Sequence, residues 1–325
     1  MKLLKKINSF VLRKRSVVSV LNKVIKRTQW YKNSYGDVLK FKKVKFNTSL
    51  VVLGSSPAKW AFDVCVPEVE CANWASMPQS IIDDFRILKN YHSYLSPNGL
   101  VLLFFSHCRG LKKDYEESSH FRNFHYFLHP ILNPFYEERV YEQLKEEIDF
   151  PIYRAMEHPL ELFKTIVKQD LLKRKPLWNS SRNCMDEDQL NDDAEKWIVG
   201  WKKEFGNTVF DVPLCGNVRK SIEFNKNVVC EMAEFCKERS LRLVFVVPPV
   251  TKNLKSRFSP SFTQAALYDL ISPAQLKYGI PLFDYLDDET LQNADFYFNS
   301  FFLNKKGRKI FTDRLIKDLK QACVR

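Results

Sequence analysis

The chain has 325 residues, of which 45% are hydrophobic and 14% aromatic, with only nine glycines. This composition excludes an intrinsically disordered or fibrous protein, and the length allows one large α/β domain or one domain with an insertion. The formal net charge is +13, and its distribution restricts the class of partner.

The excess positive charge lies entirely in the first 45 residues. These have fourteen Lys or Arg and one acidic residue, Asp37, whereas the other 280 residues have 37 of each sign. Apolar residues recur here at helical spacing, which predicts a basic amphipathic helix in a segment 1–46. Residues 1–45 therefore favour an anionic membrane surface as partner. A helix docked on the protein with solvated charges fits equally well, and no motif for specific nucleic-acid recognition accompanies the charge.

The same segment predicts neither a membrane span nor a secretory signal. Its longest uncharged run, 16–22, is far shorter than the ~20 residues of a spanning helix. Arg13-Lys14-Arg15 interrupts the apolar region, and no small-residue cleavage site follows. The eight cysteines are dispersed without CxxC or zinc spacing. We therefore expect a cytoplasmic protein with reduced thiols, at most peripheral to the inner face of the membrane.

Beyond this segment, predicted strands alternate with predicted helices. The strands lie at 50–53, 69–73, 100–105, 241–247 and 281–283, and the helices at 80–94, 217–239, 262–271 and 305–321. The strands are mainly runs of apolar residues, as in a parallel sheet buried on both faces. The expected fold is a three-layer α/β/α sandwich with about five parallel strands.

The pattern changes between residues 108 and 215. This stretch is rich in aromatic, histidine and charged residues, with predicted helices at 161–172 and 186–201 and no convincing strand. We interpret 108–215 as a helical insertion that follows the carboxyl end of a strand and caps that edge of the sheet. The α/β domain then comprises 47–107 and 216–325.

Two segments at the predicted carboxyl edge of the sheet carry candidate chemistry. The first strand ends in Gly54-Ser55-Ser56, and residues 299–307 (NSFFLNKKG) lead into the last helix. Open α/β folds bind ligands at this edge. With Asn73-Trp74-Ala75 between them, these segments resemble the sequence blocks of the SGNH/GDSL hydrolase superfamily. They are similar to a subgroup found among bacterial surface-polysaccharide and envelope genes.

The resemblance implies a flavodoxin-like fold and acyl transfer through a serine nucleophile stabilised by oxyanion donors. Ser56 corresponds to the nucleophile, and Asn299 and Phe302 stand where the family has its aspartate and histidine. The other matching positions imply substrate or oxyanion contacts. They are Ser55, Asn73, Asn299 and Asn304.

The base that should activate Ser56 is missing, because phenylalanine cannot accept a proton. His107 follows the third predicted strand at the same edge, so it is the alternative base by placement. A buried histidine beneath the cap fits this position as well. Ser56 also fits a helix cap, because Pro57 is favoured in the first turn of a helix.

Two functions follow from these residues. One is an esterase or acyltransferase that acts on a glycan or acylated carbohydrate in surface-polysaccharide or envelope biosynthesis. The other is a catalytically silent binding or scaffold protein at the membrane surface. Five tryptophans can stack on sugar rings or, more simply, serve packing alone: Trp60, Trp74, Trp178, Trp197 and Trp201.

No cofactor or metal is expected. The chain has neither GxGxxG nor the P-loop lysine spacing. His120, His125 and His129 have a spacing that can bind metal, but their aromatic neighbours favour a helical cap.

Overall fold

The computed structural model describes residues 15–77, 79–112, 145–174, 176–182 and 185–323. The chain forms two compact units. Unit 1 contains the described residues of 1–43 and 121–176, and unit 2 contains those of 44–120 and 177–325. None of the described helices combines the length and apolar character that crossing a bilayer requires.

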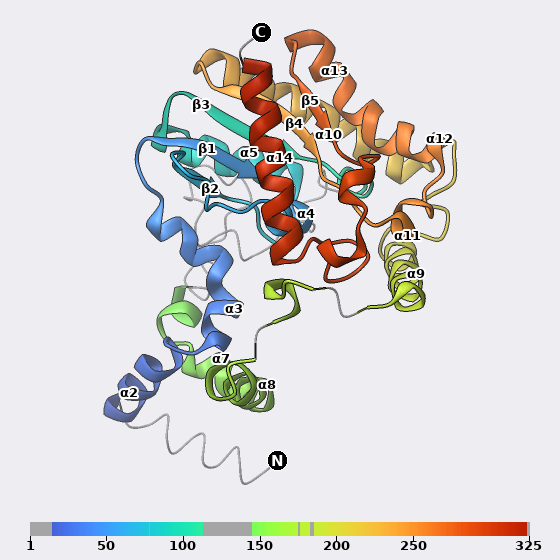
Figure 1. Cartoon of the computed structure of the whole chain (residues 1–325). Coiled ribbons are helices and arrows are strands. Elements are labelled where there is room, and N and C mark those ends of the chain that lie inside the picture. Colours follow the sequence, from blue (N-terminus) through green and yellow to red (C-terminus); the bar gives the residue numbers. More distant parts are fainter. Residues whose placement is uncertain (1–14, 78, 113–144, 175, 183–184, 324–325) are drawn as a thin grey trace. The chain divides into compact units, whose positions relative to one another are not determined.

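Unit 2 is built on a five-stranded, all-parallel sheet with the order β2-β1-β3-β4-β5 (Figure 1). The strands are β1 (Thr48–Leu53), β2 (Cys71–Asn73), β3 (Leu95–Phe104), β4 (Arg242–Val247) and β5 (Leu282–Asp284). This is the flavodoxin-like order, in which the chain direction across the sheet reverses between β1 and β3. The predicted α/β class and parallel sheet are confirmed.

The central strands are buried on both faces, as their apolar runs predict. Val51, Val52, Val101 and Leu102 are all fully buried. β3 begins earlier than predicted, because Thr48 pairs with Leu95 before a register shift that precedes the Leu50–Leu100 pair. The Pro-Asn-Gly sequence at 97–99 therefore lies in an irregular stretch of β3, where Asn98 has a positive φ of 57°.

Helices flank the sheet. The side chains of Val52, Phe104 and Val246 share one core cluster with residues of α4 (Ser56–Ala61) and α14 (Lys305–Cys323). A second group is centred on α10 (Gly216–Glu238), which contacts both α5 (Ile81–Tyr91) and α13 (Asp269–Tyr278). Short helices α11 (Lys252–Lys255) and α12 (Pro260–Thr263) follow β4.

The helix ends follow local sequence signals. Ser80 caps α5 by accepting the Asp83 backbone N–H at 3.2 Å. Asp186 and Gln189 form a capping box at the start of α9 (Glu187–Phe205), which confirms the helix predicted at 186–201. Gly307 lets the backbone of α14 approach the backbone of Phe296 closely, since a Cβ at residue 307 would lie 2.0 Å from the carbonyl oxygen of Phe296.

Unit 1 is helical in its described residues. It contains α2 (Arg15–Ile25), α3 (Gln29–Leu39), α7 (Ile152–Glu157) and α8 (Pro159–Thr165), which continues as a π-helical segment, Ile166–Leu171. Hydrogen bonds join the two stretches of chain. The Ile152 N–H donates to Asn22 Oδ1 at 3.0 Å, and the Tyr31 hydroxyl donates to the Ile148 carbonyl at 3.1 Å. The described part of the basic segment is therefore packed with residues 145–174.

Candidate functional site

A cavity of about 260 Å³ lies at the carboxyl edge of the sheet in unit 2. β1 and β3 are neighbours, so the segments that follow them meet at this edge. The other walls come from α9 and the loop before α14. Its lining residues are Ser55, Ser56, Pro57, Gln79, Ser80, Ser106, Cys108, Arg109, Lys112, Trp197, Trp201, Glu204, Phe205, Phe301 and Phe302.

Gly54 sets the position of the two serines. Its φ is +147°, and a Cβ there would lie 2.4 Å from the Cβ of Ala58. Only glycine therefore lets α4 begin directly after β1. Ser55 is the N-cap residue, but its Oγ makes no capping hydrogen bond and accepts the Gln79 N–H at 3.3 Å. Ser56 is partly exposed at the first position of α4.

A buried ion pair supports this loop from below. Asp84 Oδ1 accepts the Gly54 N–H at 2.9 Å and the side-chain amide of Gln79, while Asp84 Oδ2 pairs with the Arg109 guanidinium. Arg109 also donates to the Gln79 carbonyl at 2.8 Å. The loop after β1, helix α5 and the segment after β3 are thus joined by one charged network, which holds the polar floor of the cavity in place.

Aromatic rings form one wall of the cavity. Trp197 of α9 lies with its ring centroid 5.5 Å from that of Trp201, 5.3 Å from Phe301 and 5.4 Å from Phe302. Phe301 and Phe302 stack at 4.6 Å. Trp197 is half-buried and the other three rings are buried. The cavity lining therefore combines aromatic rings with hydroxyl and charged groups.

Asn299 and Phe302 have structural contacts at the positions where the resemblance expects aspartate and histidine. Asn299 Oδ1 accepts the backbone N–H groups of Phe301 at 3.0 Å and Phe302 at 2.8 Å, which closes a tight turn. Phe302 packs on Phe298 and on the aromatic wall. Neither side chain can act as a base toward Ser56.

His107 lies within the protein core, away from the cavity lining. It is 4% exposed, and its ring stacks on Phe258 with centroids 4.0 Å apart and planes 9° apart. Burial, with a smaller contribution from the Lys255 charge, lowers the pKa of His107 to about 3. Its Nε2 has no hydrogen-bond partner among the described residues. The imidazole is neutral at physiological pH and makes no hydrogen bond with Ser56.

The two remaining asparagines also make local contacts. Asn73 Oδ1 accepts the Ala75 N–H at 3.0 Å. Asn304 is fully buried, and its Oδ1 accepts the N–H of Gly307 at 3.0 Å, as an N-cap of α14 does. Of the predicted site residues, the structure brings Ser55 and Ser56 together in the cavity, and the other four are not among its lining residues. Their functional roles stay predictions.

Sequence reasoning did not identify several charged residues of the site. Arg109 and Lys112 follow β3 closely, so their position after a buried strand was a usable signal. Asp84 lies in the first turn of an amphipathic helix, where an acidic residue is ordinary. Glu204 is near the end of α9, and no pattern along the chain connects it with Ser56.

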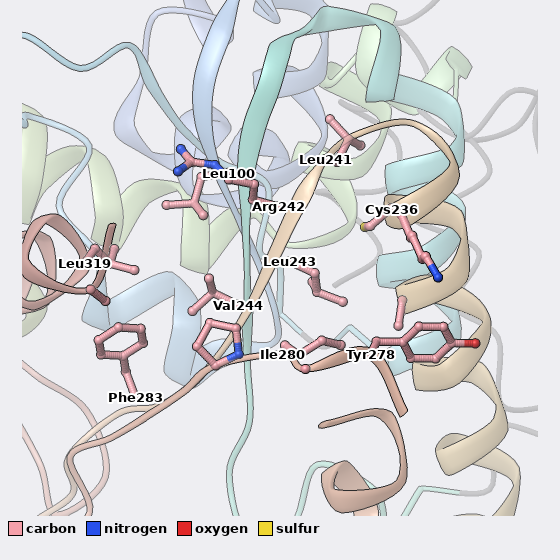
Figure 2. A pocket seen from close by; sticks show the side chains of 15 residues that line it. Leu100, Cys236, Leu241, Arg242, Leu243, Val244, Tyr278, Ile280, Phe283 and Leu319 are labelled. Carbon is pink, nitrogen blue, oxygen red and sulfur yellow. The ribbon is translucent and has the colours of Figure 1, made fainter. Parts of the chain in front are cut away.

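A second cavity of about 450 Å³ lies at the amino edge of the sheet (Figure 2). Apolar side chains dominate it, including Leu100, Val244, Ile280 and Leu319. Arg242 lies at its rim, where its Nε donates to the Asn98 carbonyl at 3.0 Å. Parallel sheets bind polar ligands at the opposite edge, so we assign the candidate site to the smaller cavity.

The described residues contain no group of three or more His, Cys, Asp or Glu side chains that could hold a metal ion. His120, His125 and His129, whose spacing can bind metal, lie outside the described residues. The cavity lining has hydroxyl, carboxylate, guanidinium and amine groups, which suit hydrogen bonding to an organic ligand.

No protein-family model matches the chain, and no curated protein matches it. The classification therefore rests on the arrangement of strands and helices. The chain is an α/β protein with a central five-strand, all-parallel sheet flanked by helices.

Proposed function

We propose that this chain is a glycan-binding protein with an SGNH-like α/β fold and a catalytically silent cleft. Its ligand is a glycan or acylated carbohydrate of a bacterial surface polysaccharide, as the motif resemblance implies. In this proposal the protein acts as a binding or scaffold component at the membrane surface. Ser55 and Ser56 contact the sugar as hydrogen-bonding groups.

One observation carries the choice of binding over catalysis. Asn299 and Phe302 occupy the positions of the acid–base pair, and their contacts are those of a closed turn. His107, the alternative base, is stacked on Phe258 with its pKa lowered to about 3. A serine without a base within hydrogen-bond reach is a weak nucleophile.

The chemistry of the cavity suits a sugar. A sugar ring presents C–H faces that pack on aromatic rings and hydroxyls that need donors and acceptors. Trp197 and Phe301 supply aromatic faces, and Ser56 supplies a hydroxyl in the same lining. The volume of about 260 Å³ is near the lower end of ligand sites, which favours one sugar unit at a time.

Titration of the full chain with defined oligosaccharides from bacterial surface polysaccharides tests this proposal. We expect tryptophan fluorescence to change on binding, and Trp197→Ala to weaken binding at least about tenfold. Val199→Ala is the matched control, because Val199 is 57% exposed on the same helix and does not line the cavity. Equal affinity in wild type and Trp197→Ala contradicts the proposal.

A second candidate function is a serine esterase or O-acyltransferase, because Ser56 and the Glu204 carboxylate line the same cavity. Here Glu204 takes the hydroxyl proton as Ser56 attacks the carbonyl carbon of an ester, and returns that proton to the alcohol that leaves as the acyl-serine forms. A fluorophosphonate probe separates the two candidates. Labelling that disappears in Ser56→Ala and falls in Glu204→Gln supports the enzyme, whereas no labelling of wild type supports the silent cleft.

A further inference from the structure

Unit 1 leaves an unusual amount of apolar surface uncovered. More than half of the large apolar side chains that the described structure leaves exposed belong to this unit. They are Val20, Val24, Phe150, Tyr153, Leu160, Phe163, Leu171 and Leu172. Soluble protein surfaces rarely gather apolar side chains in this way without a partner.

The most exposed of them form a stripe along α8 and the π-helical segment. Leu160 is 73% exposed, Phe163 is 65% exposed and Leu171 is 68% exposed. Half-buried Val167 lies between Phe163 and Leu171, so the four recur at spacings of three and four residues, as on one side of a helix. We call Leu160, Phe163, Val167 and Leu171 the α8 stripe.

Two polar side chains of the same segment hydrogen-bond to α3. Asp170 accepts the Gln29 N–H of α3 at 3.1 Å, and Gln169 accepts the Asn33 side-chain amide at 3.2 Å. These hydrogen bonds join the segment to α3, while Leu160, Phe163 and Leu171 stay exposed. The apolar side chains of an amphipathic helix in a globular protein usually pack on the core, and these three do not.

Basic side chains accompany the stripe. Lys164 and Lys168 are exposed within it, and residues 159–175 contain five Lys or Arg against two acidic residues. α2 shows the same combination, since Val20 and Val24 are 60% and 55% exposed beside Lys23. α7 contacts both α2 and α8.

From this arrangement we propose that the α8 stripe is a membrane-binding surface. Leu160, Phe163 and Leu171 enter the headgroup–acyl boundary of an anionic bilayer, and Lys164 and Lys168 contact the lipid phosphates. The basic side chains indicate an anionic bilayer as the partner, because cations beside exposed apolar side chains complement an anionic lipid surface. This membrane-binding surface does not include residues 1–14 and does not depend on the glycan cleft.

Flotation of the full chain with vesicles of phosphatidylcholine, with and without phosphatidylglycerol, tests the proposal. The variant Leu160→Ser with Phe163→Ser removes two apolar contacts and keeps the whole basic N-terminal segment. We expect its partition onto the anionic vesicles to fall at least about tenfold. Leu276→Ser is the control, because Leu276 is 86% exposed in unit 2 and should leave partition unchanged.

The charge contribution is tested separately with Lys164→Gln and Lys168→Gln. This double variant should bind anionic vesicles several-fold more weakly and leave binding to pure phosphatidylcholine unchanged. Circular dichroism confirms that each variant is folded. Unchanged partition of the Leu160→Ser, Phe163→Ser variant overturns the proposal. A second outcome also overturns it: the wild type is a dimer, and the variant is a monomer that binds vesicles as the wild type does. The stripe would then be the contact with a second copy of the chain.

Discussion

Arg109 and Asp84 form an ion pair beneath the candidate cavity, with only 3% and 0% of their side chains exposed. Asp84 also accepts the Gly54 N–H at the end of β1. The two buried charges are thus paired with each other. The pair connects the stability of unit 2 to the placement of Ser55 and Ser56.

Removal of one partner of this pair should destabilise the protein strongly. We expect Asp84→Ala to lower the free energy of unfolding by about 3–5 kcal/mol, because the Arg109 charge stays buried without its carboxylate. Urea unfolding followed by tryptophan fluorescence measures the change.

Two comparisons sharpen this test. Asp313→Ala breaks the exposed Lys309–Asp313 pair of α14 and should cost less than about 1 kcal/mol. Asp84→Leu combined with Arg109→Met should cost less than Asp84→Ala alone, since neither buried charge of this pair remains. A larger cost for the double variant contradicts this account of the pair.

Gly54→Ala should disrupt the loop that carries the two serines. The backbone has φ +147° and the new Cβ would lie 2.4 Å from the Ala58 Cβ, so we expect a loss of about 3 kcal/mol or more. Thermal unfolding checks this. Gly200→Ala in α9 meets no atom within 4 Å and should instead stabilise by about 0.5–1 kcal/mol. Equal changes in stability for Gly54→Ala and Gly200→Ala would contradict this prediction.

His107 should make the protein less stable at acidic pH. Burial lowers its pKa from 6.5 to about 3, so between these values the unfolded chain binds a proton that the folded chain does not. The free energy of unfolding should therefore fall by about 1.4 kcal/mol for each pH unit below 6.5, from this group alone. His107→Phe keeps a ring against Phe258 and removes the titration.

The measurement is urea unfolding of wild type and His107→Phe at several pH values from 7 to 4. The difference in the free energy of unfolding between wild type and His107→Phe should grow as the pH falls. Parallel profiles would mean that His107 titrates alike in both states, and would restore it as a candidate base.

The basic N-terminal segment stays a predicted membrane contact, and its test follows from the structure of unit 1. Residues 15–43 pack within that unit, for instance through the Asn22–Ile152 hydrogen bond, so only residues 1–14 should be removed. They carry five Lys or Arg and no acidic residue. Removal of residues 1–14 should weaken binding to anionic vesicles at least about tenfold at low salt. The remaining binding should depend less on salt concentration than that of the full chain. Equal binding with and without them, at low and high salt, would contradict the prediction.

Local signals were sufficient for most of the fold. The apolar run ending at Leu53, the helix start at Ser80 and the run 241–247 each correspond to an element of the structure within a few residues. Strand–helix alternation then implied a parallel sheet, because neighbouring parallel strands need a helical crossover. The start of β3 was the exception, because pairing with β1 extends this strand through the Pro-Asn-Gly sequence at 97–99.

The candidate site can be predicted only where it follows the chain. The glycine turn after β1 predicts that Ser55 and Ser56 lie at the carboxyl edge of the sheet, and both line the cavity there. The wall formed by Trp197 and Phe301 could not be predicted, because these rings are over a hundred residues apart and meet only when α9 and the loop before α14 pack together.

The sequence by itself determined the parallel α/β architecture, the edge at which ligands can bind and the basic character of the first 45 residues. These depend on backbone propensity, hydrophobic periodicity and charge, which are properties of neighbouring residues. Tertiary packing alone decided that Arg109 pairs with Asp84, that His107 is neutral against Phe258, and that the α8 stripe faces outward. Burial and long-range contacts set the charge and exposure of a side chain, and neither is a property of its local sequence.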